Sequence, residues 1–211
     1  MSRLRTFPLD RLVAKRGTIG GFLFENIDLP RTLFHEIVVP NKPFLFHDVE
    51  GRKKTTKTEF RFDFIQFPDQ PFRGYKALVG RTFEFPVNPT PGYIDGSIYL
   101  LSAHNSVDVV ELAFLAARRG SLDVRITLAI DFESEGTGYA NTDGLEVEVS
   151  LRPEGIRIDP GIMKRAKRKS PRALLDGFVE PGILGDLVSE EGQATVRLRD
   201  RDPTGGRRDA L

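Results

Sequence analysis

The densest group of side chains that could do chemistry is acidic and lies in residues 131–150, DFESEGTGYANTDGLEVEVS. The segment has no Lys or Arg and contains six carboxylates, namely Asp131, Glu133, Glu135, Asp143, Glu146 and Glu148. Its first part, ending at Gly136, follows the spacing of the twelve-residue calcium loop D-x-[DN]-x-[DN]-G-x5-E. The match fails at the last position, where Thr142 replaces the bidentate Glu that calcium needs. A different calcium site in the loop, using Glu135, Asn141 and Asp143, stays an alternative.

The same charge has three explanations without a metal. The carboxylates can lie on a solvated strand face, they can attract a protein with a basic surface, or the chain's own basic segment 163–172 can cover them. Tyr139 lies among them in the loop, and we expect it to be exposed, as an aromatic contact in an interface. The predicted partner-binding residues are therefore Asp131, Glu133, Glu135, Tyr139, Asp143, Glu146 and Glu148.

Two of the three histidines lie in LFHEIVVPNKPFLFHDV, which is nearly symmetrical about Asn41. If this segment is a hairpin in that register, His35 pairs with His47. Two adjacent imidazoles can begin a zinc site, which would need a third ligand such as His104. A histidine on a mostly apolar strand face is more often a packed residue with a hydrogen-bonded nitrogen. No metal or cofactor is predicted.

Signals for catalysis and for nucleotide binding are poor. The chain lacks Cys and a G-x-S-x-G motif, and GTIGG (17–21) has neither dinucleotide nor P-loop spacing. No catalytic residue is predicted, although an enzyme with a dispersed site would also lack such motifs. The basic runs RKKTTK (52–57) and MKRAKRKSPR (163–172) contain no interleaved aromatics, and the net charge is only +1. This composition does not favour nucleic acid as a partner.

Composition places the chain among globular proteins of a reducing compartment. Its 211 residues are 39% hydrophobic, enough to bury a core, and the absence of Cys excludes disulfides. No apolar run is long enough for a signal peptide or a membrane span. These features predict a cytoplasmic protein.

The acidic residues must be positioned by two strands. In 122–133, Val124, Ile126, Leu128, Ile130 and Phe132 alternate with polar residues, and LEVEV (145–149) repeats the pattern. A period of two is typical of a strand with one buried face. The Gly-, Asn- and Asp-rich residues between them are typical of a loop. We expect antiparallel neighbours, with Asp131 and Glu133 near Glu146 or Glu148.

Further strands are expected throughout the first 160 residues. The segments are 21–27, 33–39, 43–49, 58–67, 81–87 and 95–103, with 194–199 as a later strand; RKKTTK (52–57) is expected to be a solvated turn. Residues 106–120 have features of both a helix and a strand; three valines and the short Gly120–Ser121 connection favour the strand. The pattern predicts an all-β fold, an antiparallel two-sheet β-sandwich with a basic, partly helical C-terminal segment.

Two parts of the chain are expected to differ in character. Residues 1–160 form the predicted sandwich domain, and residues 161–211 form a basic extension. In that extension Ser170 is expected to cap a short helix that ends near Gly177. The polar tail 200–211 is expected to be disordered.

The functional hypothesis follows from the acidic face. It is a non-enzymatic, cytoplasmic protein-binding module that uses an acidic β-hairpin face, with another protein of basic surface as its partner. A neutralising partner of a basic toxin or nuclease fits this description. The alternatives are a metal-dependent or carbohydrate-binding β-sandwich and an enzyme whose site is not recognisable from one sequence.

Overall fold

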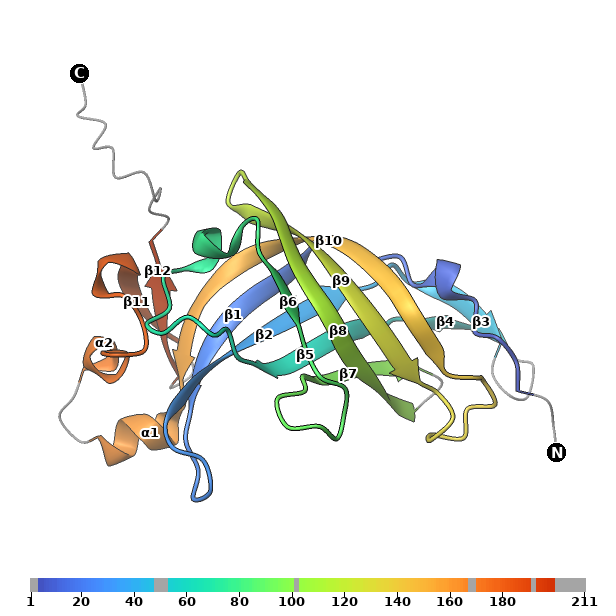
Figure 1. Ribbon diagram of the computed structural model, residues 1–211, viewed down its shortest axis with the longest axis horizontal. Coiled ribbons are helices and arrows are strands. Elements are labelled where there is room, and N and C mark those ends of the chain that lie inside the picture. Colours follow the sequence, from blue (N-terminus) through green and yellow to red (C-terminus); the bar gives the residue numbers. More distant parts are fainter. Residues whose placement is uncertain (1–3, 48–52, 101–102, 167–169, 191–192, 200–211) are drawn as a thin grey trace.

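The protein is mostly β, with little helix (Figure 1). The computed structural model describes all residues except 1–3, 48–52, 101–102, 167–169, 191–192 and 200–211. Its strands are β1 (Gly17–Phe24), β2 (Thr32–Pro40), β3 (Phe44–His47), β4 (Lys53–Thr56), β5 (Glu59–Ile65), β6 (Thr82–Glu84), β7 (Asp95–Leu100), β8 (Ala103–Arg118), β9 (Ser121–Asp131), β10 (Thr142–Ile158), β11 (Leu184–Glu190) and β12 (Gln193–Leu198). Its helices are η1 (Leu9–Arg11), η2 (Tyr75–Leu78), α1 (Pro160–Arg165), α2 (Pro171–Leu174) and η3 (Pro181–Ile183).

Seven strands close into a mixed barrel. The order is β1, β2, β5, β7, β8, β9 and β10, and β10 returns to pair with β1. That last pairing is parallel and joins Gly17 to Leu151, whereas the neighbouring pairs around the barrel are antiparallel. Because β1 is hydrogen-bonded on both sides, the curved sheet has no open edge there.

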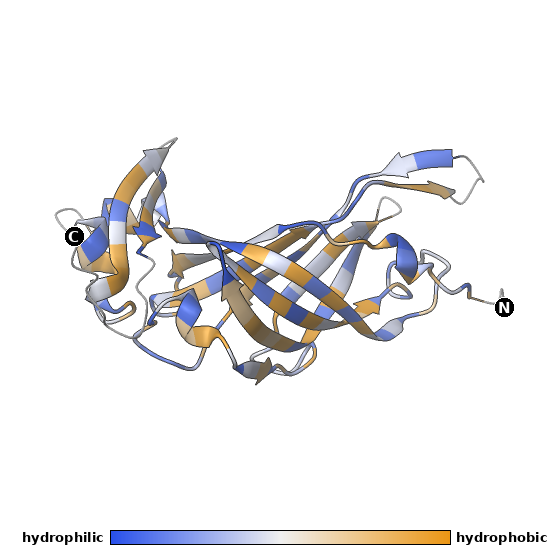
Figure 2. Ribbon diagram, turned by 90° about the horizontal axis from the view of Figure 1, so that it is seen from above, coloured by the Kyte–Doolittle hydropathy of each residue, from blue (hydrophilic) through white to orange (hydrophobic). Residues whose placement is uncertain are grey.

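The predicted two-sheet sandwich is therefore wrong. A sandwich and a small barrel both bury one face of each strand, so both produce the same alternation of apolar and polar residues. The two folds differ in strand pairing: in a barrel the first and last strands of the sheet are hydrogen-bonded to each other, as β1 and β10 are here. The alternation along the barrel strands is visible in Figure 2.

The barrel interior is filled by side chains. Strand β9 shows the pattern clearly, because Leu122, Val124, Ile126, Leu128 and Ile130 are all buried while the residues between them are half-buried. Aromatic residues such as Phe60, Phe62 and Phe114 fill the remaining volume. This is a packed core, as expected for a barrel of so few strands.

Several local predictions are confirmed. Residues 106–118 belong to strand β8, which forms a hairpin with β9 through a turn at residues 119–120. Strands β9 and β10 are antiparallel neighbours joined by a loop. The side chain of Ser170 accepts a hydrogen bond from the Ala173 backbone N–H (3.2 Å) and caps α2.

Other local expectations fail. Residues 53–56, expected in a turn, form strand β4, which pairs with β3 in a hairpin that projects from the barrel (Figure 2). Strand β11 and helix α1 were not predicted. Strand β10 also continues past residue 151 as far as Ile158. None of the helices in the described part of the chain is long and apolar enough to cross a membrane.

The elements after residue 160 attach to the far end of β10. Strand β12 pairs with β10 through Ile156 and Val196, and β11 pairs with β12. Ile162, Leu175 and Val196 belong to the same buried cluster as the barrel interior. The tail 200–211 lies outside the described residues.

Candidate functional site

The predicted acidic residues lie on the outside of the barrel and in the loop at one end of it. Glu146 and Glu148 alternate with the buried Val147 and Val149 on β10, so their side chains are exposed. Three further carboxylates, not selected from the sequence, occupy half-buried positions on the neighbouring strands; they are Asp108, Glu111 and Asp123. The outer face of β8, β9 and β10 therefore carries carboxylates on three adjacent strands.

The register between β9 and β10 differs from the expected one. Glu146 lies opposite Thr127 and Glu148 lies opposite Arg125. The carboxylates of the two strands are not paired with one another, because the β9–β10 pairing ends at Ile130 and Thr142, before Asp131 and Glu133 are reached. Two basic residues contact carboxylates of this face: Arg125 Nη2 lies 3.8 Å from the Glu111 carboxylate, and Arg118 Nε lies 3.6 Å from that of Asp123. The like-charge cost of a direct pair is thereby avoided.

The acidic loop is organised by its own side chains. The carboxylate of Asp131 accepts hydrogen bonds from the backbone N–H groups of Glu133 and Ser134, both at 3.1 Å, and from the Ser134 hydroxyl. These hydrogen bonds lower the pKa of Asp131, those of Ser134 most strongly. The Asn141 side-chain oxygen accepts from the backbone N–H groups of Phe132 (2.8 Å) and Glu133 (2.9 Å). These hydrogen bonds hold the backbone of the loop.

Tyr139 is buried, so its expected exposure is wrong. Only 6% of it is accessible, and its ring packs against Phe7, Phe46 and Phe132. The Arg5 guanidinium carbon lies 4.7 Å from the ring centre. A polar loop surrounds Tyr139 in the sequence, but the N-terminal segment supplies an apolar pocket for it. It offers little surface for a partner.

The expected pairing of His35 with His47 is also wrong. His35 lies opposite Gly21 on β1 and Ile65 on β5, and His47 lies opposite Lys53 on β4. His35 points into the barrel, where its Nδ1 is 3.1 Å from the Tyr75 hydroxyl oxygen. Burial lowers the pKa of His35 to about 3, so the ring is neutral. Within the described ranges, no group of three or more His, Asp or Glu side chains is placed to hold a metal ion.

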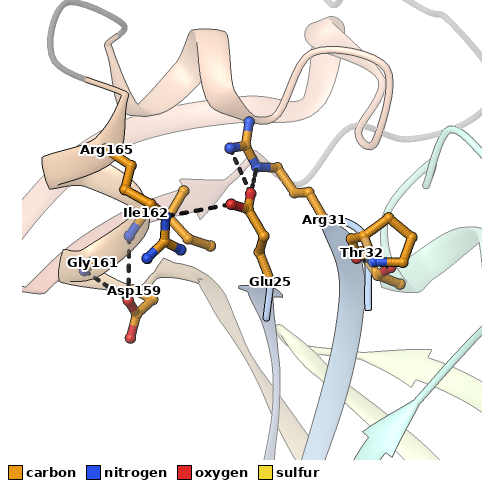
Figure 3. Close-up of polar contacts among 8 residues, drawn as sticks. Glu25, Arg31, Thr32, Asp159, Gly161, Ile162 and Arg165 are labelled. Carbon is orange, nitrogen blue, oxygen red and sulfur yellow. Dashed lines mark hydrogen bonds and ion pairs between the residues drawn. The ribbon is translucent and has the colours of Figure 1, made fainter. Parts of the chain in front are cut away.

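The described part of the basic segment 163–172 lies away from the acidic face. Figure 1 shows α1 at the opposite end of the molecule from the loop between β9 and β10. The Glu25 carboxylate accepts from Arg31 Nε at 2.8 Å and forms an ion pair with Arg165 Nε at 3.4 Å (Figure 3). Arg172 donates to the Gly185 carbonyl. These contacts fasten α1 to the β1–β2 hairpin and α2 to β11.

A large cleft, which sequence reasoning missed, lies where β12 leaves the barrel. Its volume is about 1450 Å³, and its walls come from β10, from the segment around η2, and from β12. Gly20 and Gly155 form part of the floor. A Cβ at Gly155 would lie 2.5 Å from the Val196 carbonyl oxygen, so the absence of a side chain permits the close approach of β12.

The cleft is more basic than acidic. Its lining includes six basic residues, Arg73, Lys76, Arg152, Arg157, Arg197 and Arg199, and three acidic residues, Glu36, Glu154 and Glu180. Glu36 pairs with Arg157, and Glu154 lies 3.2 Å from Arg152. Burial raises the pKa of the Glu36 carboxyl, and the neighbouring Arg157 opposes that shift.

Compared with known proteins, the chain matches no family model, no curated protein and no solved structure at significant similarity. Its function is therefore argued from the geometry and charge of its own surfaces.

Proposed function

We propose that this protein is a binding module that recognises another protein of basic surface through the outer face of β8, β9 and β10. The observation that carries the proposal is the run of outward carboxylates over three hydrogen-bonded strands, to which the loop adds Glu133, Glu135 and Asp143. Arg125 and Arg118 are opposing charges, paired with Glu111 and Asp123. A surface of one sign steers an oppositely charged partner and speeds its association.

The rigidity of the face favours binding. Asp131 and Asn141 hold the loop through hydrogen bonds to backbone N–H groups, and the strands belong to the closed barrel. A surface that is already ordered loses little conformational entropy on association. A basic toxin or nuclease is the partner class that we propose, because such a protein presents the Lys and Arg side chains that this face would attract.

The test reverses the charge of Glu146 and Glu148, the two exposed carboxylates of the face that alternate with buried residues on β10. Proteins captured from the native cells are identified, and the association of the captured protein with the purified chain is measured by surface plasmon resonance. The variant Glu146→Lys/Glu148→Lys should lower the association rate at least tenfold at low salt and weaken its salt dependence, because electrostatic steering is lost. Wild-type association should slow as the salt concentration rises.

A matched control separates the acidic face from total charge. Asp28→Lys/Asp186→Lys makes the same change in net charge at exposed positions elsewhere. This control should bind almost as the wild type does. If both double variants bind their partner at the wild-type rate, the acidic face is not the interface.

A further inference from the structure

The cleft beside β12 has the form of a ligand site that is separate from the acidic face. Its floor comes from β10, where Pro153 lies opposite Ile19 and Ile156 lies opposite Gly21, so that β10 contains an extra residue at this point. Such bulges often occur where a strand turns towards a site. In Figure 1, the segment of η2 lies between the β11–β12 pair and the top of the barrel. The cleft is thus bounded by three separate parts of the chain.

Three arginines of the cleft are without an ion-pair partner among the residues that the structure describes. Arg197 lies on β12 and Arg199 follows directly after the end of that strand, and both line the cleft together with Thr195. Arg73 comes from the segment before η2. All three are exposed, and none of them forms an ion pair with another residue that the structure describes. The acidic residues Glu36 and Glu154, by contrast, are already paired with other arginines.

The basic surface continues beyond the cleft. A small adjoining pocket shares Lys76, Gly120 and Pro153 with it and adds Arg119 and also Arg118, which is paired with Asp123. Arg119 has a positive φ of 47°, a conformation that non-glycine residues adopt at a cost in free energy. Positions with such strain are often found at binding sites.

We infer that the cleft binds a ligand that carries two or more phosphate groups. The lining has an excess of three positive charges, and a phosphate monoester carries about −1.5 to −2 at neutral pH. About two phosphate groups would therefore balance the site. Arginine suits this task because its planar guanidinium donates two parallel hydrogen bonds to phosphate oxygens. The volume of about 1450 Å³ leaves room for the rest of such a ligand beside Ile183, Val188 and Leu198.

The experiment titrates the full chain with inorganic tripolyphosphate in a calorimeter, at low and at moderate salt. Wild-type protein should show saturable binding at one site, weaker at moderate salt. Arg197→Ala/Arg199→Ala should weaken binding at least tenfold. Arg73→Ala, which changes a different segment of the lining, should weaken binding by a similar factor, and this would show that the loss is not caused by a local change in β12.

The matched control is Lys53→Ala/Lys54→Ala, which removes two exposed charges from β4, outside the lining of the cleft. It should change the affinity less than twofold. Equal losses in the two double variants, or no saturable binding by the wild type, would overturn the inference. The inference would also be overturned if citrate bound as tightly as tripolyphosphate, because the site would then recognise negative charge in general and not phosphate.

Two further probes distinguish the sources of the phosphate. ATP represents free phosphorylated compounds, and vesicles that contain a phosphoinositide represent lipid headgroups. If ATP binds more tightly than the vesicles do, and the Arg197→Ala/Arg199→Ala variant loses that affinity, the ligand is a soluble phosphorylated compound. If the vesicles bind more tightly than ATP does, with the same loss of affinity in the variant, the ligand is a lipid headgroup. Either order of affinity supports a phosphate site. If the Arg197→Ala/Arg199→Ala variant binds both ATP and the vesicles as tightly as the wild type does, the inference is contradicted.

Discussion

At the scale of single residues, burial determines the chemistry of the two side chains that the sequence made most ambiguous. His35 is enclosed by the aromatic rings of Phe67, Phe72 and Tyr75, with ring-centre distances of 4.8, 4.5 and 5.6 Å. Its neutral ring has the Tyr75 hydroxyl as a hydrogen-bonding partner. Among the residues that the structure describes, no zinc site is formed around His35, because its ring neighbours are aromatic.

His35 gives the protein a predictable dependence on pH. Its pKa is lowered to about 3 in the folded state, whereas an unfolded chain has a histidine pKa of about 6.5. Between these two pKa values the unfolded chain binds a proton that the folded chain does not. The contribution of His35 to stability is therefore fully present above pH 6.5 and decreases as the pH falls. The free energy of unfolding, measured with urea, should decrease by about 1 kcal/mol between pH 6.5 and 5.5 because of this residue.

The variant His35→Gln isolates that effect, because glutamine does not titrate and keeps a polar atom for Tyr75. Its unfolding free energy should vary less over the same interval than that of the wild type. The exposed His104 is present in both proteins and cancels in the comparison. If both proteins show the same slope, His35 is not the group responsible.

At the scale of elements, short turns set the geometry of the β8–β9 hairpin. Arg118 pairs with Ser121, so Arg119 and Gly120 form a two-residue turn, and both have positive φ values of 47° and 72°. Turns of this kind match the twist of the flanking strands and favour Asn–Gly. Glycine suits the second position, whereas arginine at the first is under strain.

Replacing Arg119 by asparagine should therefore stabilise the fold. Asparagine tolerates the left-handed conformation, and the expected gain in unfolding free energy is about 0.5–1 kcal/mol. Thermal or urea unfolding measures it. Arg118→Asn is the control, because Arg118 lies in the strand and asparagine is a poor strand former; it should give no gain. A gain of the same size in both variants would point to the removal of charge and not to the turn.

At the scale of the whole molecule, charge of opposite sign is separated in space although the net charge is only +1. The acidic face occupies β8, β9 and the first part of β10, and the basic cleft lies along the last part of β10. The same long strand, β10, therefore joins the two proposed sites. Its second half pairs with β1 on one side and with β12 on the other.

This arrangement depends on Gly155. In Gly155→Ala the new methyl group would meet the Val196 carbonyl oxygen at 2.5 Å, so β12 must move away from β10. We expect a loss of about 1–3 kcal/mol in unfolding free energy, and faster hydrogen exchange of the β12 amides. Gly20→Ala is the control on the same floor, since its methyl group would meet its nearest neighbours at 3.6 Å. Equal destabilisation by the two changes would show that the approach of β12 is not limiting.

The sequence by itself determined the local features. Alternation identified the buried faces of β9 and of the first half of β10, and short connections predicted the β8–β9 hairpin, because these properties depend on neighbours along the chain. It also located most of the exposed carboxylates, since polar residues that alternate with a buried face must point outwards. Glu146 and Glu148 are the clearest cases.

Only the tertiary structure decided the closure of the barrel, the burial of Tyr139 and the existence of the cleft. The parallel pairing of β1 with β10 is made by backbone groups, which are alike in almost every residue and leave no pattern in the sequence. Tyr139 is buried because Arg5 and Phe7 return to it from the start of the chain. The cleft is lined by both Arg73 and Arg199, which are far apart in the chain, and nothing in their local sequence predicts that they line the same cleft.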